Sequence, residues 1–156
     1  MPILFAIGRV AFVLIFILSG AQKLMDISGT GALIAPKLMI PGFAADVVKQ
    51  IEATAGLPIA QILAIVAGVV EVVSGLLIAF NIGTRVASVL LIVFTLAATY
   101  YFHDFWNMAG PAATDNTIHA MKNLSLIGAL MVFFVLGSWR PIAMQSDAEE
   151  AAATRY

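Results

Sequence analysis

The chain of 156 residues contains no cysteine. This absence excludes disulfide bonds, thiol redox chemistry, cysteine-ligated zinc and iron–sulfur clusters. Charge is also scarce, because only 11% of the residues are charged and the net charge is -1. The chain therefore carries no basic field of the kind that binds nucleic acid, and we expect no nucleic-acid partner.

Apolar residues make up 62% of the sequence, and the mean hydropathy is +1.01. Soluble domains average about 45–50% apolar and about 25% charged residues, so this composition is atypical of that class. Intrinsic disorder is excluded as well, because it requires low hydropathy and high net charge. The composition predicts a small integral membrane protein whose main partner is the lipid bilayer.

Four apolar stretches are long enough to cross a bilayer as helices, which takes roughly 20 residues each. They cover residues 3–21, 57–80, 84–102 and 118–138. Asp115 and the two polar residues after it are expected to cap the fourth helix. A backbone in lipid must satisfy its own hydrogen bonds, and these stretches lack the alternation of barrel strands. We predict an all-α protein, a bundle of four transmembrane helices.

The segment between the first two spans is too interrupted to cross the membrane. Its second half carries Phe43, Val47 and Ile51 on one helical face, with polar side chains on the remainder. This pattern predicts a short amphipathic helix between transmembrane helices 1 and 2. It would lie on the membrane surface or cap the bundle.

The domain organisation follows from these spans: residues 1–140 form one membrane domain, and 141–156 form a flexible acidic tail. Arginines and lysines are balanced between the two membrane faces, so the positive-inside rule does not decide the orientation. The loop at 103–119 has no lysine or arginine, which favours both termini in the cytoplasm.

Two ionisable residues lie well inside the first two predicted spans, Arg9 in the first and Glu71 in the second. Such groups cost at least about 2.5–3.5 kcal/mol each to insert, so they are candidates for function. Counting 1.5 Å per residue places both at similar depths, within reach of each other. They are interpreted as a buried ion pair that fixes helix register, as a proton relay or ligand site, or as the lining of a water-filled cavity.

Small residues share the helical face of Glu71, namely Ala64, Gly68 and Gly75. Their spacing of seven, three and four residues from Glu71 allows another helix backbone to approach closely. The approaching helix can belong to the same chain or to a second copy, so a homo-oligomer or larger membrane complex is expected.

A second polar group gathers at one membrane face. Its members end or begin the predicted helices: Lys23, His103, His119, Lys122 and Asn123. Snorkelling lysines and an aromatic belt explain each residue singly. Together, however, ammonium, imidazole and carboxamide groups under aromatic rings suit a polarised carbonyl, such as that of a quinone. His103 is the first candidate for moving a proton and Glu71 the second. No metal or haem site is expected.

The motifs taken in order resemble the DoxX family of small four-helix bacterial membrane proteins. The matching residues are Arg9, Phe16-x-x-Ser19-Gly20-x-x-Lys23-Leu24, Gly68-x-x-Glu71-x-x-Ser74-Gly75, Gly83-Thr84-Arg85, His103, and Lys122-Asn123-Leu124 with Gly128. The resemblance implies a multi-pass protein of the bacterial inner membrane. Members of that family include the small subunit of a thiosulfate:quinone oxidoreductase and membrane partners of oxidative-stress enzymes.

Three functions remain open at this point. The first is a redox-associated subunit, part of a quinone-linked oxidoreductase, that binds a quinone at the second polar group. The second is a non-catalytic anchor or assembly partner of a larger complex, and the third is a transporter of small solutes or protons. No flavin or nicotinamide fingerprint is present, so no intrinsic cofactor is expected, and a soluble redox enzyme would have to supply electrons.

Overall fold

The structure is a computed structural model that describes residues 2–137. Four long helices, each apolar enough to cross a membrane, organise this part of the chain. They are α1 (Pro2–Met25), α4 (Ile59–Ala79), α5 (Thr84–Phe102) and α6 (Gly110–Leu136). The shorter elements are α2 (Ile27–Ile34), η1 (Ala35–Lys37), η2 (Gly42–Ala44), α3 (Ala45–Ala55) and η3 (Phe105–Asn107). The all-α class with four membrane-spanning helices is thus confirmed.

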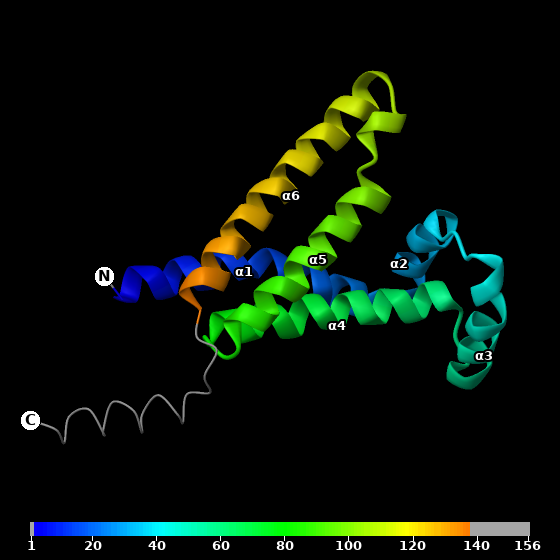
Figure 1. Cartoon of the computed structure of the whole chain (residues 1–156), viewed down its shortest axis with the longest axis horizontal. Helices are drawn as coiled ribbons and strands as arrows, with labels where there is room; N and C mark the ends of the chain where they lie inside the picture. Colours follow the sequence, from blue (N-terminus) through cyan, green and yellow to red (C-terminus); the bar gives the residue numbers. More distant parts are fainter. Residues whose placement is uncertain (1, 138–156) are drawn as a thin grey trace, which may run out of the picture.

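The four long helices form two antiparallel pairs. Figure 1 shows α1 lying along α4, while α5 and α6 run together away from that pair at an angle. The tight turn at residues 80–83 joins the pairs at one end of the molecule. At the other end α2 packs against the start of α4, and α3 lies beyond it. The helix pairs therefore contact each other most closely near the turn.

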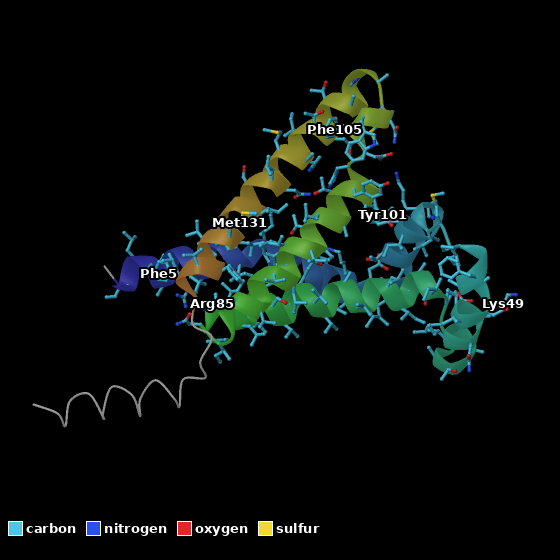
Figure 2. All side chains as sticks on the ribbon, in the orientation of Figure 1. Phe5, Lys49, Arg85, Tyr101, Phe105 and Met131 are labelled. Atoms are coloured by element: carbon cyan, nitrogen blue, oxygen red, sulfur yellow. The ribbon has the colours of Figure 1, made fainter. Side chains whose placement is uncertain are left out.

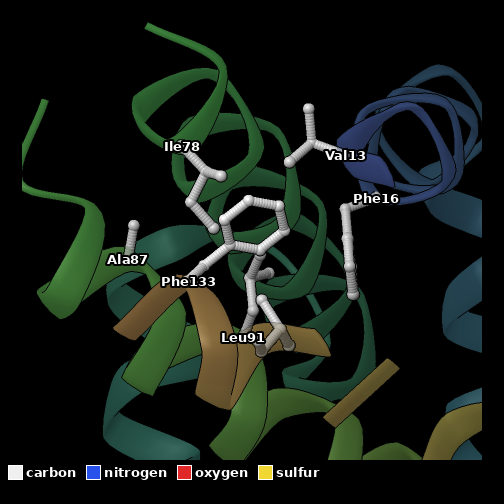
Figure 3. Packing of buried hydrophobic residues seen from close by; sticks show 7 residues of the cluster. Val13, Phe16, Ile78, Ala87, Leu91 and Phe133 are labelled. Carbon is white, nitrogen blue, oxygen red and sulfur yellow. The ribbon is translucent and has the colours of Figure 1, made fainter. Parts of the chain in front are cut away.

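The hydrophobic core lies where the two pairs meet (Figure 3). Phe133 of α6 points between Val13 of α1 and Leu91 of α5, and Ile78 of α4 closes the cluster. The rings of Phe12 and Phe133 lie 5.0 Å apart between centroids. Most other large apolar side chains remain exposed, as expected for helices that face lipid.

Two predicted helix boundaries are wrong. α6 begins at Gly110, with Pro111 in its first turn, rather than near residue 118. The expected capping residues lie inside the helix, where Asn116 and Thr117 donate to carbonyls four residues earlier. α1 continues past residue 21 to Met25 because Lys23 finds its partners within the bundle.

The segment between the first two spans contains two helices where one was expected. The amphipathic helix is confirmed as η2 and α3, and Phe43, Val47 and Ile51 stay exposed on it. The described chain does not cover this apolar face, which favours the membrane surface over a cap. The additional helix, α2, was missed because its glycines and serine resemble a turn. Asp26 caps it by accepting from the amide of Gly29 at 2.8 Å.

Glycines bring α1 and α4 into close contact. A Cβ atom on Gly20 would lie only 2.7 Å from the carbonyl oxygen of Gly68. A Cβ atom on Gly68 would in turn lie 2.7 Å from Leu24 Cγ, and one on Gly75 would lie 2.8 Å from Ile17 Cγ1. The small-residue face of α4 is therefore used within the chain. This contact fixes the register in which the two helices run.

Gly20→Ala tests the contact. The added methyl group has no space against the α4 backbone, so we expect a loss of about 1–3 kcal/mol in unfolding free energy. Gly128→Ala is the matched control, because a Cβ atom there meets no atom within 4 Å. Denaturant-induced unfolding in detergent measures both. Equal stability of the two variants would contradict the close packing.

Candidate functional site

Glu71 forms a buried ion pair with Lys23 across the α1–α4 contact. Lys23 Nζ lies 2.7 Å from Glu71 Oε2, and the carboxylate side chain is only 3% exposed. The same ammonium donates to Ser19 Oγ at 2.6 Å, one turn earlier on α1. The ring of Phe94 on α5 also lies near the ammonium, with its centroid 5.8 Å from Nζ. The charges are thus paired inside the helix bundle.

The predicted pairing of Glu71 with Arg9 is wrong, because the helix register opposes it. Gly20 packs against Gly68 and Glu71, so Glu71 lies level with the second half of α1. Continuing this antiparallel register places Arg9 beside the turn at 80–83. The depth count failed because it took the first apolar residue of α1 as the membrane surface.

Arg9 is nevertheless buried, with 9% of its surface exposed. Its guanidinium carbon lies 4.7 Å from the centroid of the Phe5 ring. Among residues 2–137 no hydrogen-bond partner reaches its Nε atom, and no carboxylate pairs with it. The structure therefore separates the two members of the predicted Arg9–Glu71 site.

A polar cluster joins the far ends of α5 and α6, and we name it the imidazole cluster: His103, Asn116, His119, Thr99 and Asn123. The rings of His103 and His119 stack with centroids 4.9 Å apart and planes 10° apart. One turn further along, Asn123 donates to Thr99 Oγ1 at 2.9 Å. Aromatic side chains lie nearby on α5 and η3, including Tyr101 and Phe105 in Figure 2.

The hydrogen bonds assign the protons of His103. Asn116 Nδ2 donates to the carbonyl of Ala112, so the Oδ1 atom of Asn116 must accept from its other partner. That partner is His103 Nδ1, 3.0 Å away, which therefore carries a hydrogen. In the neutral ring Nε2 is then the acceptor, and no donor among residues 2–137 occupies it. The cluster presents a group that can take up or deliver a proton.

The predicted five-residue group is only partly assembled. His103, His119 and Asn123 lie together, whereas Lys23 pairs with Glu71 on the other helix pair. Lys122 is exposed on α6, and no partner among the described residues reaches it. Within residues 2–137 no group of three or more His, Cys, Asp or Glu is placed to hold a metal ion.

Sequence reasoning missed three contributors to these sites. Ser19 precedes Lys23 by four residues, a spacing that places both on one helical face and could have indicated the contact. Asn116 was interpreted as a helix cap because the start of α6 was misplaced. A further ion pair links η1 to the α5–α6 loop, with Lys37 Nζ 3.3 Å from Asp104 Oδ1. Nothing in the sequence indicated that pair, since 67 residues separate its members.

Comparison with known proteins identifies the family. The model of the DoxX family matches residues 4–104, which is well over half of the chain. The chain belongs to the DoxX family. It is also 35% identical over 136 residues to a protein of Escherichia coli (strain K12), the inner membrane protein YphA. That match covers 87% of this chain and 84% of the relative. No solved structure matches.

Membership in the DoxX family, the inner-membrane relative and the four apolar helices establish a multi-pass inner-membrane protein. The segment that matches the family model includes both members of the Lys23–Glu71 pair and also His103. It ends before α6, so His119, Lys122 and Asn123 lie outside it.

Lys23→Met and Glu71→Leu test the ion pair. Each single change leaves one charge unpaired in a low-dielectric interior. We expect each variant to lower the unfolding free energy by about 2–3 kcal/mol. Breaking a fully buried pair costs about 3–5 kcal/mol, and the loss here is smaller because Lys23 is partly exposed. The double variant leaves no unpaired charge, so its loss of unfolding free energy should be less than half that of either single variant.

The matched control is Lys37→Met, which removes a cation from the more exposed pair with Asp104. Its effect on unfolding should be much smaller, because exposed ion pairs contribute little. Additive losses at Lys23 and Glu71, with no recovery in the double variant, would show that the two groups do not interact.

Proposed function

We propose that the protein is a redox-associated membrane subunit that binds a quinone, or a similar small carbonyl or phenolic compound, at the imidazole cluster. The observation that carries this proposal is the pair of stacked imidazoles, in which Asn116 fixes the tautomer of His103. In this proposal the quinone is both cofactor and substrate. The chain itself supplies only the groups that bind it and exchange protons with it.

The location of the cluster supports a lipid-soluble ligand. It lies on helices whose outer faces are apolar, at the end where α5 and α6 diverge from the other pair. A hydrophobic ring system can reach it from the bilayer, while half-buried His103 and Asn123 offer polar contacts to a carbonyl or hydroxyl oxygen. Flat aromatic side chains such as Tyr100 and Trp106, 6.0 Å apart between centroids, would border the ring.

The chemistry of the cluster fits proton exchange with such a ligand. Reduction of a quinone to a hydroquinone takes up two electrons and two protons. His103 Nε2 can hold a proton at the ligand oxygen, and Asn123 can donate a hydrogen bond to it. Since the sequence has no nucleotide-cofactor fingerprint, the electrons come in this proposal from a soluble redox enzyme docked on the membrane protein.

Quinone binding can be measured by fluorescence. The chain has two tryptophans, and Trp106 lies on η3, three residues after His103 in the sequence. In a Trp139→Phe background, titration with ubiquinone-1 in detergent should quench Trp106 saturably. A quinone carbonyl can only accept, so its partner is the Nε2–H of the protonated His103 ring. His103→Leu removes that donor and should weaken binding about tenfold, the effect of one lost hydrogen bond.

Lys49→Gln on exposed α3 is the control and should bind as the parent does. Lys122→Gln should also leave binding unchanged, since that side chain is exposed and makes no hydrogen bond to the cluster among the described residues. Unsaturable quenching, or the same affinity in the His103 variant as in the parent, would contradict the proposal.

The Lys23–Glu71 pair favours a second candidate, a non-catalytic anchor or assembly partner of a larger complex. Because this pair is complete within the chain, its role can be wholly structural. On this alternative a soluble enzyme co-purifies with the membrane protein, and His103→Leu leaves the activity of the complex intact. A transporter would instead move solute into proteoliposomes.

We also propose that both termini face the cytoplasm, that the protein forms a homo-oligomer or larger membrane complex, and that residues 141–156 form an acidic tail. The tail lies outside the described residues. Protease protection of tags at either terminus in spheroplasts tests the sidedness, and native mass spectrometry tests the assembly.

A further inference from the structure

Neither the imidazole cluster nor the Lys23–Glu71 pair uses Arg9. This side chain is nine-tenths buried, and its Nε atom finds no hydrogen-bond partner among residues 2–137. A buried, unpaired guanidinium is costly in a membrane protein, since the charge cannot be neutralised by deprotonation. Its position therefore calls for an anion that the described chain does not supply.

A groove of about 350 Å³ opens beside this guanidinium. Its walls are almost wholly apolar and come from α1 and α6, with Arg9 as the charged member: Leu4, Phe5, Gly8, Arg9 and Phe133. A Cβ atom added to Gly8 would meet nothing within 4 Å, so the missing side chain leaves open space in the groove. The Phe5 ring lies against the guanidinium and holds it at the groove wall.

The groove lies near one end of the α1–α4 pair. The α1–α4 register places Arg9 beside the turn at residues 80–83, where α4 ends and α5 begins. A second guanidinium, Arg85, lies at that end in the first turn of α5, as Figure 2 shows, and its Nε atom also lacks a partner among the described residues. When these helices cross a bilayer, their ends lie near the phospholipid phosphates, and the acyl chains extend toward the bilayer centre.

We propose that this groove is a binding site for an anionic phospholipid. Arg9 binds the headgroup phosphate through charge-assisted hydrogen bonds, which guanidinium groups form in bidentate geometry. The guanidinium points toward Phe5, so the phosphate and glycerol lie beside Leu4 and Phe5. From there an acyl chain runs over Gly8 toward Phe133 and the bilayer centre. The occupant is a lipid rather than a free anion because the walls of the groove are apolar and open to the bilayer.

Native mass spectrometry with added phosphatidylglycerol or phosphatidylcholine tests this site. The parent protein should retain phosphatidylglycerol preferentially. Arg9→Gln should lower its apparent affinity about tenfold and leave the weaker binding of phosphatidylcholine nearly unchanged. Gly8→Leu should weaken both lipids, because the new side chain fills the acyl groove without removing the charge.

Further controls keep the test decisive. Lys49→Gln removes one positive charge far from the groove and should bind as the parent does, and a thermal melt in detergent verifies that each variant is folded. The Gly8 variant adds a side chain into open space, so its fold is retained even if the Arg9 variant is unstable. Inorganic phosphate alone should give no stabilisation.

Equal phosphatidylglycerol binding by the parent and both variants would overturn the proposal. So would stabilisation by inorganic phosphate that matches the lipid, since that indicates a free-anion site. Loss of a dimer, rather than of lipid, in the Arg9 variant would show that a second copy supplies the anion and would overturn it too.

Discussion

The close contact of α1 with α4 is the constraint on which the rest of the structure depends. Backbone meets backbone at Gly20 and Gly68, where neither helix has space for a methyl group. Because helices in lipid gain no hydrophobic energy from associating, such close packing is their main source of register. This register brings Lys23 to Glu71 and places Arg9 at the opposite end. The close contact at Gly20 and Gly68 thus determines which groups surround Glu71 and Arg9, the buried charged residues of the described helices.

The second helix pair serves a different purpose. α5 and α6 meet the first pair at the core around Phe133 and then diverge from it (Figures 1 and 3). Divergence leaves their far ends free of packing against α1, and polar residues there satisfy one another instead. Asn116, His103 and His119 form one group, and Asn123 with Thr99 forms another one turn away. The protein thus combines a closely packed helix pair, α1 and α4, that contains an ion pair with a second pair, α5 and α6, that carries a polar cluster at its far end.

Sequence reasoning predicted the parts of the fold that depend on hydropathy and local spacing. The four spans and the small-residue face around Glu71 follow from composition and a helical period. The partner of Glu71 did not follow, because a residue count along one helix cannot give the register between two. α2 and the start of α6 were also misjudged, since the glycines inside α2 and the Gly110-Pro111 pair that begins α6 resemble turns. The stacking of His103 on His119 depends on how two helices approach each other, which no local pattern specifies.

The helix register can be measured directly, because the chain has no cysteine of its own. Two cysteines introduced by Ile17→Cys and Gly75→Cys should form a disulfide rapidly in native membranes, since these positions are in contact. The pair Ile17→Cys and Leu63→Cys should not, because it corresponds to the register in which Arg9 would meet Glu71. Cross-linking of the second pair, without the first, would contradict the arrangement of α1 and α4 and everything derived from it.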